Sequence, residues 1–139
     1  MKKLEILLTV SAATLCSLVV WYTFCQSDYD NEALAATPTT VRFEKDTLQL
    51  GTVKYGTKHE ALFRFVNTGT APLLIRDVRP SCGCTSVKWS KHPVKPGETG
   101  EIRTIYDPNS LGKFQKNIEV HCNIPENAIN LKICGSVIE

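Results

Sequence analysis

The sequence lacks the common motifs of catalysis. It has no nucleophile elbow, no phosphate-binding loop and no paired acidic motif, and each of its three histidines, His59, His92 and His121, stands alone among polar residues. Beyond residue 36 the basic residues are scattered singly, and the formal charge of the chain is only +2. These absences predict a protein that is not an enzyme, uses no cofactor and binds no nucleic acid.

Helical periodicity is also absent beyond residue 25. Apolar and polar residues instead alternate with period two, as in Ala61–Val66 and Ile102–Tyr106, and turn sequences such as Asn67-Thr68-Gly69 separate the runs. About seven or eight short antiparallel strands in roughly 100 residues are typical of an Ig-like β-sandwich, which gives the expected all-β fold class. An up-and-down barrel is the alternative, weakened because the strands are few and short.

The same alternation predicts the core. The residues expected on the two inner faces are Phe43, Leu50, Phe63, Phe65, Leu73, Ile75, Ile102, Tyr106, Ile118, Val120, Leu131 and Ile133.

The N-terminus contains the one long apolar run. Lys2 and Lys3 precede Ile6–Phe24, a stretch of 19 residues without a charge. As a helix it would span about 28 Å, close to the roughly 30 Å of a bilayer core. Trp21 and Tyr22 stand at its far end, where interfacial aromatics are enriched. The pattern predicts one N-terminal transmembrane helix within residues 1–25, a linker over residues 26–40 and the β-sandwich over residues 41–139.

A cleaved signal peptide is the alternative for the N-terminal segment. Such peptides have a shorter apolar core with a small-residue cleavage site just after it, whereas Ala33-Leu34-Ala35 lies well downstream here. Both interpretations place the domain in the cell envelope. We expect it in the periplasm, either anchored in the inner membrane by the N-terminal helix or exported after cleavage.

Cys82-Gly83-Cys84 is the densest chemical signal in the chain. In an extended strand the two Cα atoms would lie about 6.6 Å apart, near the upper limit for a disulfide, so a local bridge needs a bend that Gly83 would permit. Four interpretations stay open: a disulfide, a reduced pair, a metal site and a thiol–disulfide oxidoreductase. The last two have less support, since there is no second cysteine pair with zinc spacing and no helix to lower a thiol pKa. We therefore assign no catalytic, cofactor or metal residue, and only a thiol pair or disulfide at Cys82 and Cys84.

Two further cysteines lie in the predicted domain. Cys122 shares a strand face with Ile118 and Val120, whereas Cys134 alternates away from the core positions of its strand. Strand phase thus predicts a buried Cys122, a half-exposed Cys134 and no bond between them. Trp89 is interpreted as packing against the core, with a binding face as the alternative.

Several motifs occur in an order that indicates a family: Phe63–Gly69, Pro72–Ile75, Ser81–Thr85, Trp89, Lys95–Gly100, Tyr106-Asp107, Phe114, Lys116 and Ile118. With these motifs, roughly residues 41–138 resemble the bacterial domain of unknown function 1573 (DUF1573). The resemblance implies an Ig-like fold and an envelope location, and it implies no activity.

Two functions follow as hypotheses. The first is a non-enzymatic, membrane-anchored extracytoplasmic module that binds a protein or a surface polymer through sheet edges or loops. The second is a periplasmic thiol-active or metal-handling domain that uses Cys82 and Cys84. Fold alone does not choose between them.

Overall fold

The computed structural model describes residues 17, 19, 20 and 37–139. Most of the predicted transmembrane segment and most of the predicted linker lie outside these residues. In the part of the chain that is described, no helix combines the length and the apolar character needed to cross a membrane.

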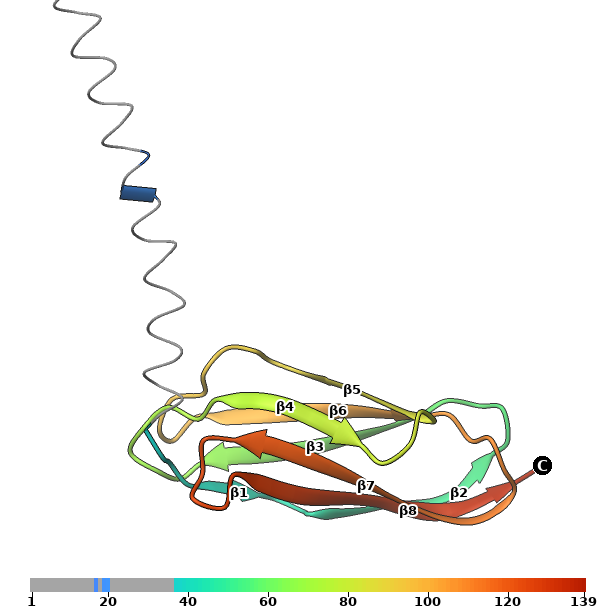
Figure 1. Cartoon of the computed structure of the whole chain (residues 1–139). Coiled ribbons are helices and arrows are strands. Elements are labelled where there is room, and N and C mark those ends of the chain that lie inside the picture. Colours follow the sequence, from blue (N-terminus) through green and yellow to red (C-terminus); the bar gives the residue numbers. More distant parts are fainter. Residues whose placement is uncertain (1–16, 18, 21–36) are drawn as a thin grey trace, which may run out of the picture. The chain divides into compact units, whose positions relative to one another are not determined.

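The described domain consists of two four-stranded sheets, which confirms the all-β class. One sheet has the order β1-β3-β6-β5 and the other the order β2-β8-β7-β4. Figure 1 shows the two layers facing each other. The strands are β1 (Val41–Phe43), β2 (Thr47–Lys54), β3 (His59–Asn67), β4 (Ile75–Pro80), β5 (Thr85–Trp89), β6 (Thr99–Tyr106), β7 (Gly112–Cys122) and β8 (Ala128–Ile138).

The core lies between the sheets, and most of its residues are those predicted from alternation. Ile102, Ile118 and Leu131 are fully buried, and the other predicted residues are also buried except two. Phe43 and Leu50 are half-buried and pack against the rim of the core. The period-two pattern therefore located the inner faces because successive strand side chains point to opposite sides.

The expectation of purely antiparallel strands is wrong at one pair. β2 runs parallel to β8, with Leu48 opposite Ile133 and Val53 opposite Val137. The register shifts between Gln49 and Gly51, so Leu50 is the extra residue of a bulge. Alternation reports which face a residue takes but not the direction of the neighbouring strand, so the sequence did not reveal this pairing.

Asn67, at the end of β3, anchors one end of the sandwich. Its side chain is completely buried, and its Nδ2 donates to the carbonyl oxygens of Ala71 at 2.8 Å and Val94 at 2.9 Å. Its Oδ1 accepts from the amide of Gly69 at 3.1 Å. Thr39 adds its hydroxyl 3.0 Å from the same Oδ1. A Cβ at position 69 would collide with Thr39, so this close approach requires glycine.

Asn123 holds the entering chain from the other sheet. Its Nδ2 donates to the carbonyl of Thr37 at 2.8 Å and to that of Pro72 at 2.9 Å. Its own carbonyl accepts from the amide of Thr39 at 2.8 Å. Residues 37–40, which the sequence assigns to the linker, are therefore held against the domain where it begins.

We predict that Asn67→Ala lowers the free energy of unfolding by about 2–4 kcal/mol, because it removes the four hydrogen bonds of a completely buried side chain and leaves a cavity in its place. Urea denaturation followed by circular dichroism measures the change. Thr68→Ala, at the exposed neighbouring position, is the matched control and should stay within about 0.5 kcal/mol of the parent chain. Equal stability of the two variants would contradict the anchoring role of Asn67.

Candidate functional site

Cys82 and Cys84 form a disulfide in the turn between β4 and β5. Their Cα atoms are 5.3 Å apart, shorter than an extended chain gives, so the backbone bends here as a local bridge requires. Gly83 has no positive φ, and a Cβ built on it would meet no atom within 4 Å. Gly83 therefore permits this bend, as expected, but the turn also has room for a side chain in an ordinary conformation.

Backbone and hydroxyl contacts hold the disulfide turn against both sheets. The amide of Asp107, just after β6, donates to the carbonyl of Cys84 at 2.8 Å, and the amide of Ser81 donates to Asn117 of β7 at 2.8 Å. The buried hydroxyl oxygen of Thr85 lies 3.6 Å from the sulfur of Cys82 and 4.0 Å from that of Cys84. Both cysteines are half-exposed, so the bridge is fixed in position and yet open to solvent.

The disulfide turn belongs to one end of the sandwich, which we call the distal end. It comprises the turns β2–β3, β4–β5 and β6–β7 and the last residues of β8, and Figure 1 shows the carboxyl terminus at this end. A depression of about 450 Å³ is lined by Tyr55, Cys84 and Asp107, among others. A second, of about 530 Å³, lies between Tyr55 and Leu111.

Tyr55 and Leu111 are the exposed apolar residues that sequence reasoning missed. Each exposes 54% of its surface, and Ile138, whose carbonyl accepts from the amide of Tyr55 at 2.8 Å, exposes 48%. Gly56 and Gly112 follow Tyr55 and Leu111 directly, and both glycines have a positive φ. A large apolar residue next to a turn glycine was the available signal, because such a residue is placed at a loop tip and not on a strand face.

Cys122 and Cys134 are free thiols, as strand phase predicted. Cys122 is 2% exposed and belongs to the core, and burial raises the pKa of its thiol from the usual 9.0 to about 11. Cys134 is half-exposed on the outer face of β8, with its sulfur 3.8 Å from the carbonyl oxygen of Leu48. Neither thiol lies at the disulfide turn.

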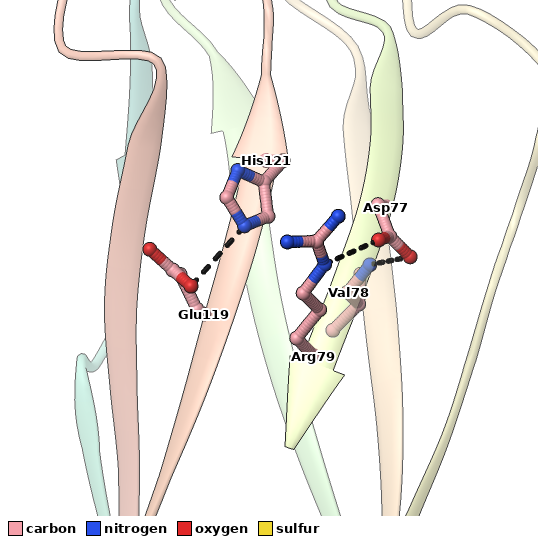
Figure 2. A network of polar contacts seen from close by, with 5 residues as sticks. All are labelled: Asp77, Val78, Arg79, Glu119 and His121. Carbon is pink, nitrogen blue, oxygen red and sulfur yellow. Dashed lines mark hydrogen bonds and ion pairs between the residues drawn. The ribbon is translucent and has the colours of Figure 1, made fainter. Parts of the chain in front are cut away.

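A charged cluster occupies the outer face of β4 and β7 (Figure 2). Asp77 stands opposite His121, and Arg79 opposite Glu119. Arg79 Nε donates to Asp77 Oδ2 at 2.7 Å, and His121 Nε2 lies 3.2 Å from Glu119 Oε2. The hydrogen bond from Arg79 lowers the pKa of the Asp77 carboxyl below its usual value, and the amide of Val78 adds to this effect. Each of these two pairs lies within a single strand, Arg79–Asp77 in β4 and His121–Glu119 in β7, and such partly exposed pairs contribute little to stability.

His121 is not brought to the cysteine pair. It points to the outer face while Cys122 points to the core, as expected for neighbours on a strand. The disulfide turn contacts β7 at Asn117, whose carbonyl accepts from the amide of Ser81. His121 lies four residues further along β7, away from this turn. Within the described residues, no three or more histidine, cysteine, aspartate or glutamate side chains are grouped as a metal site would need.

Trp89 lies at the end of β5, half-buried against the core, which confirms its packing role. The ammonium group of Lys91 stands 3.7 Å from the centre of its ring, a cation–π contact. Trp89 also borders a groove of about 680 Å³ along β5 and β6. His92 lines this groove, whereas His59 lies at the start of β3.

Comparison with protein families identifies one match, DUF1573, described as a protein of unknown function, over residues 41–137. The chain belongs to the DUF1573 family. The resemblance seen in the motifs is thus confirmed, and the match covers the eight strands of the sandwich except the last residue of β8. Comparison with curated proteins gave no match.

Solved structures share the fold of this DUF1573 domain. A protein of unknown function from Porphyromonas gingivalis W83 superposes with a TM-score of 0.65 at 20% identity, covering 73% of this chain and 48% of that one. The chain thus spans about half of that protein. The ASH/PapD-like domain 7 of human CEP192 gives 0.57 at 14% identity, covering 73% of this chain and 87% of that one. Vibrio cholerae VesB protease gives 0.56 at 14% identity, covering 81% and 35%. At these identities the likeness establishes the fold alone.

We predict that alkylation of the denatured, unreduced chain modifies Cys122 and Cys134 and leaves Cys82 and Cys84 unmodified, because only the latter two are bonded. Peptide mapping by mass spectrometry locates the label. In the folded chain Cys134 should react faster than Cys122, since Cys122 is buried and its raised pKa keeps it protonated. Label on Cys82 without a reductant would contradict the disulfide.

Burial of Cys122 also predicts a loss of stability in alkali. The unfolded thiol ionises above pH 9, whereas the folded thiol stays protonated up to about 11, so ionisation favours unfolding across this window. Below pH 9 the thiol contributes no pH dependence. The loss should reach about 2–3 kcal/mol. Urea denaturation at several pH values measures it. Cys122→Ala, whatever its absolute stability, should decline less steeply, and parallel curves would contradict the assignment.

Proposed function

We propose that this protein is a non-enzymatic, extracytoplasmic module, held at the inner membrane by residues 1–25, whose Ig-like domain binds a protein partner through its distal end. A surface polymer is the second kind of partner in the proposal. No cofactor takes part.

The observation that supports the proposal is that the two ends of the domain differ. The chain enters at the end where Asn67 and Asn123 hold residues 37–40, and the distal end lies at the other tips of the same strands (Figure 1). A domain attached through residue 37 therefore has its distal end as the face most remote from the attachment. Tyr55 and Leu111 are exposed on that face.

The chemistry of the distal end suits binding to a protein. The exposed Tyr55 beside shallow depressions resembles the aromatic anchors that dominate protein interfaces, and Leu111 adds exposed apolar surface next to it. The disulfide stiffens the adjacent β4–β5 turn, and less conformational entropy is then lost on binding. The loops of an Ig-like sandwich are the usual place for such a surface, because the sheets hold them rigidly.

Site-specific photo-crosslinking in intact cells tests the binding. We predict that a photoreactive amino acid at Leu111 gives discrete crosslinked products, whereas the same group at Glu126, an exposed residue at the entry end, gives few. Mass spectrometry then identifies what is attached. A further pair of chains carries the photoreactive group at Asn109. In that background Leu111→Asp should leave the domain folded and should abolish the crosslinked products. Equal products from Leu111 and Glu126 would overturn the proposal.

The location is tested in the same cells. A reporter that is active only outside the cytoplasm, fused after Glu139, should be active and should remain with the membrane fraction. Activity in the soluble fraction would indicate a cleaved signal, and an inactive reporter would overturn the extracytoplasmic location.

The half-exposed disulfide favours a second candidate, a thiol-active domain. In that function a thiolate of a dithiol substrate would attack one sulfur of the Cys82–Cys84 bridge, form a mixed disulfide and release the other cysteine as a thiolate. The second thiolate of the substrate would then attack the mixed disulfide, so that the substrate leaves as a disulfide and the domain is left with two thiols. A purified chain that oxidises a dithiol peptide repeatedly in the presence of oxidised glutathione, and loses this with Cys82→Ser, would favour this candidate. Metal analysis of the same sample tests the metal-handling form.

A further inference from the structure

β5 is the most open of the four sheet edges in the described domain. Each sheet ends in two edge strands, which are β1 and β5 in one sheet and β2 and β4 in the other. β1 has only 3 residues, β2 is interrupted by the shift at Gly51, and β4 has a shift after Ile75 and ends in Pro80. These are devices that discourage strand addition. β5 pairs with β6 over all five of its residues without a shift.

The hydrogen-bond phase of β5 shows which of its groups face outward. The amide of Asp107 donates to the carbonyl of Cys84, which makes this pair a hydrogen-bonded one. Hydrogen-bonded and non-hydrogen-bonded pairs alternate in an antiparallel ladder, so Ser86 and Lys88 bond β6. The backbone groups of Val87 and Trp89 therefore point away from β6. Within the described residues, neither makes a backbone hydrogen bond to a turn or a loop.

The formal charge beside this edge is positive, and the neighbouring acidic residues are already paired with other groups. Residues 82–97 contain Lys88, Lys91 and Lys95 and no acidic residue. Glu60 and Glu101, in the adjoining groove, both pair with Arg103, at 3.2 and 3.6 Å.

The third acidic residue of the groove is also engaged. Glu98 accepts from the amide of Lys95 at 3.2 Å. Lys88 points to the outer face and has no ion pair within the described domain.

The inner side of the edge is apolar. Val87 and Trp89 are half-buried and pack against the core, so part of each side chain remains uncovered at the rim. A strand laid along β5 would place alternate side chains over these two residues and the others beside Lys88. Apolar residues suit the first set and acidic residues the second.

We propose that β5 accepts an extended polypeptide segment of a partner, alternating apolar and acidic residues, as an added strand bonded to the backbone of Val87 and Trp89. The segment lengthens the β1-β3-β6-β5 sheet, and its carboxylates pair with Lys88 and its neighbouring lysines. The inference deepens the proposed function, since it names a mode of protein binding, but it concerns a side of the domain and not the distal end.

The test uses the full chain in detergent and two capped peptides of about ten residues, one alternating valine and glutamate and the other valine and lysine. Fluorescence anisotropy gives the affinities, and hydrogen exchange with mass spectrometry follows residues 85–92. We expect the glutamate peptide to bind about tenfold or more tightly than the lysine peptide and to slow exchange in this segment. Failure of the glutamate peptide to bind, or equal binding of both, would overturn the proposal.

Matched variants distinguish the contribution of backbone hydrogen bonds to peptide binding from that of side-chain contacts. Val87→Pro removes an outward amide and no bond to β6, whereas Val87→Ala shortens the side chain and keeps the amide. We expect Val87→Pro to weaken binding by about tenfold or more and Val87→Ala by no more than about twofold. Lys88→Glu should reverse the preference between the peptides, and it tests the proposal even if Val87→Pro does not fold. Equal affinities of the two Val87 variants, or an unchanged preference in Lys88→Glu, would contradict it.

Failure of the edge proposal can be distinguished from failure of the proposed function. If crosslinking from Leu111 succeeds while the glutamate peptide fails to bind, only the edge proposal falls. If the peptide binds and protects residues 85–92 while Leu111 gives no specific product, the distal end is not the binding face and the edge proposal stands.

Discussion

The domain depends on one constraint: each strand has to bury one of its two faces against the opposite sheet. Phe63, Ile102, Ile118 and Leu131 meet in the centre, and removing such surfaces from water is the main favourable term in folding. Because successive side chains alternate, this burial also fixes the register of each strand, since a slip by one residue would turn the apolar set outward. Two sheets facing each other in this way leave four edges, and β5 differs from the other three because β1 is short and β2 and β4 are interrupted.

Buried amide groups determine how the chain enters this core. Asn67 ends β3 of one sheet and Asn123 directly follows β7 of the other, and both bond the backbone or side chains of residues 37–39. Their polar atoms have partners, so they stabilise the entry end instead of weakening it. This fixes the attachment at one end of the sandwich, and the functional proposal rests on the resulting difference between the two ends.

The disulfide links the distal end to the edge. Cys84 is followed directly by Thr85, the first residue of β5, and its carbonyl accepts the bond from Asp107 that sets the phase of the β5–β6 ladder. A bridge closed over a single intervening residue restrains little of the unfolded chain, so its larger effect is to fix the local backbone. The same turn thus borders the depressions at the distal end and positions the outward groups of Val87 and Trp89.

The sequence by itself determined the strand faces, the core residues, the phase of Cys122 and Cys134 and the family, because these depend on side-chain periodicity and local motifs. It did not determine that β2 runs parallel to β8, that Asn67 and Asn123 hold the entering chain, or that Tyr55, Cys84 and Leu111 meet at one end. Those features join residues that are distant in sequence. Only the packing of the two sheets decides which turns and edges become neighbours. The alternation of apolar and polar residues within a strand does not depend on that packing and therefore could not predict it.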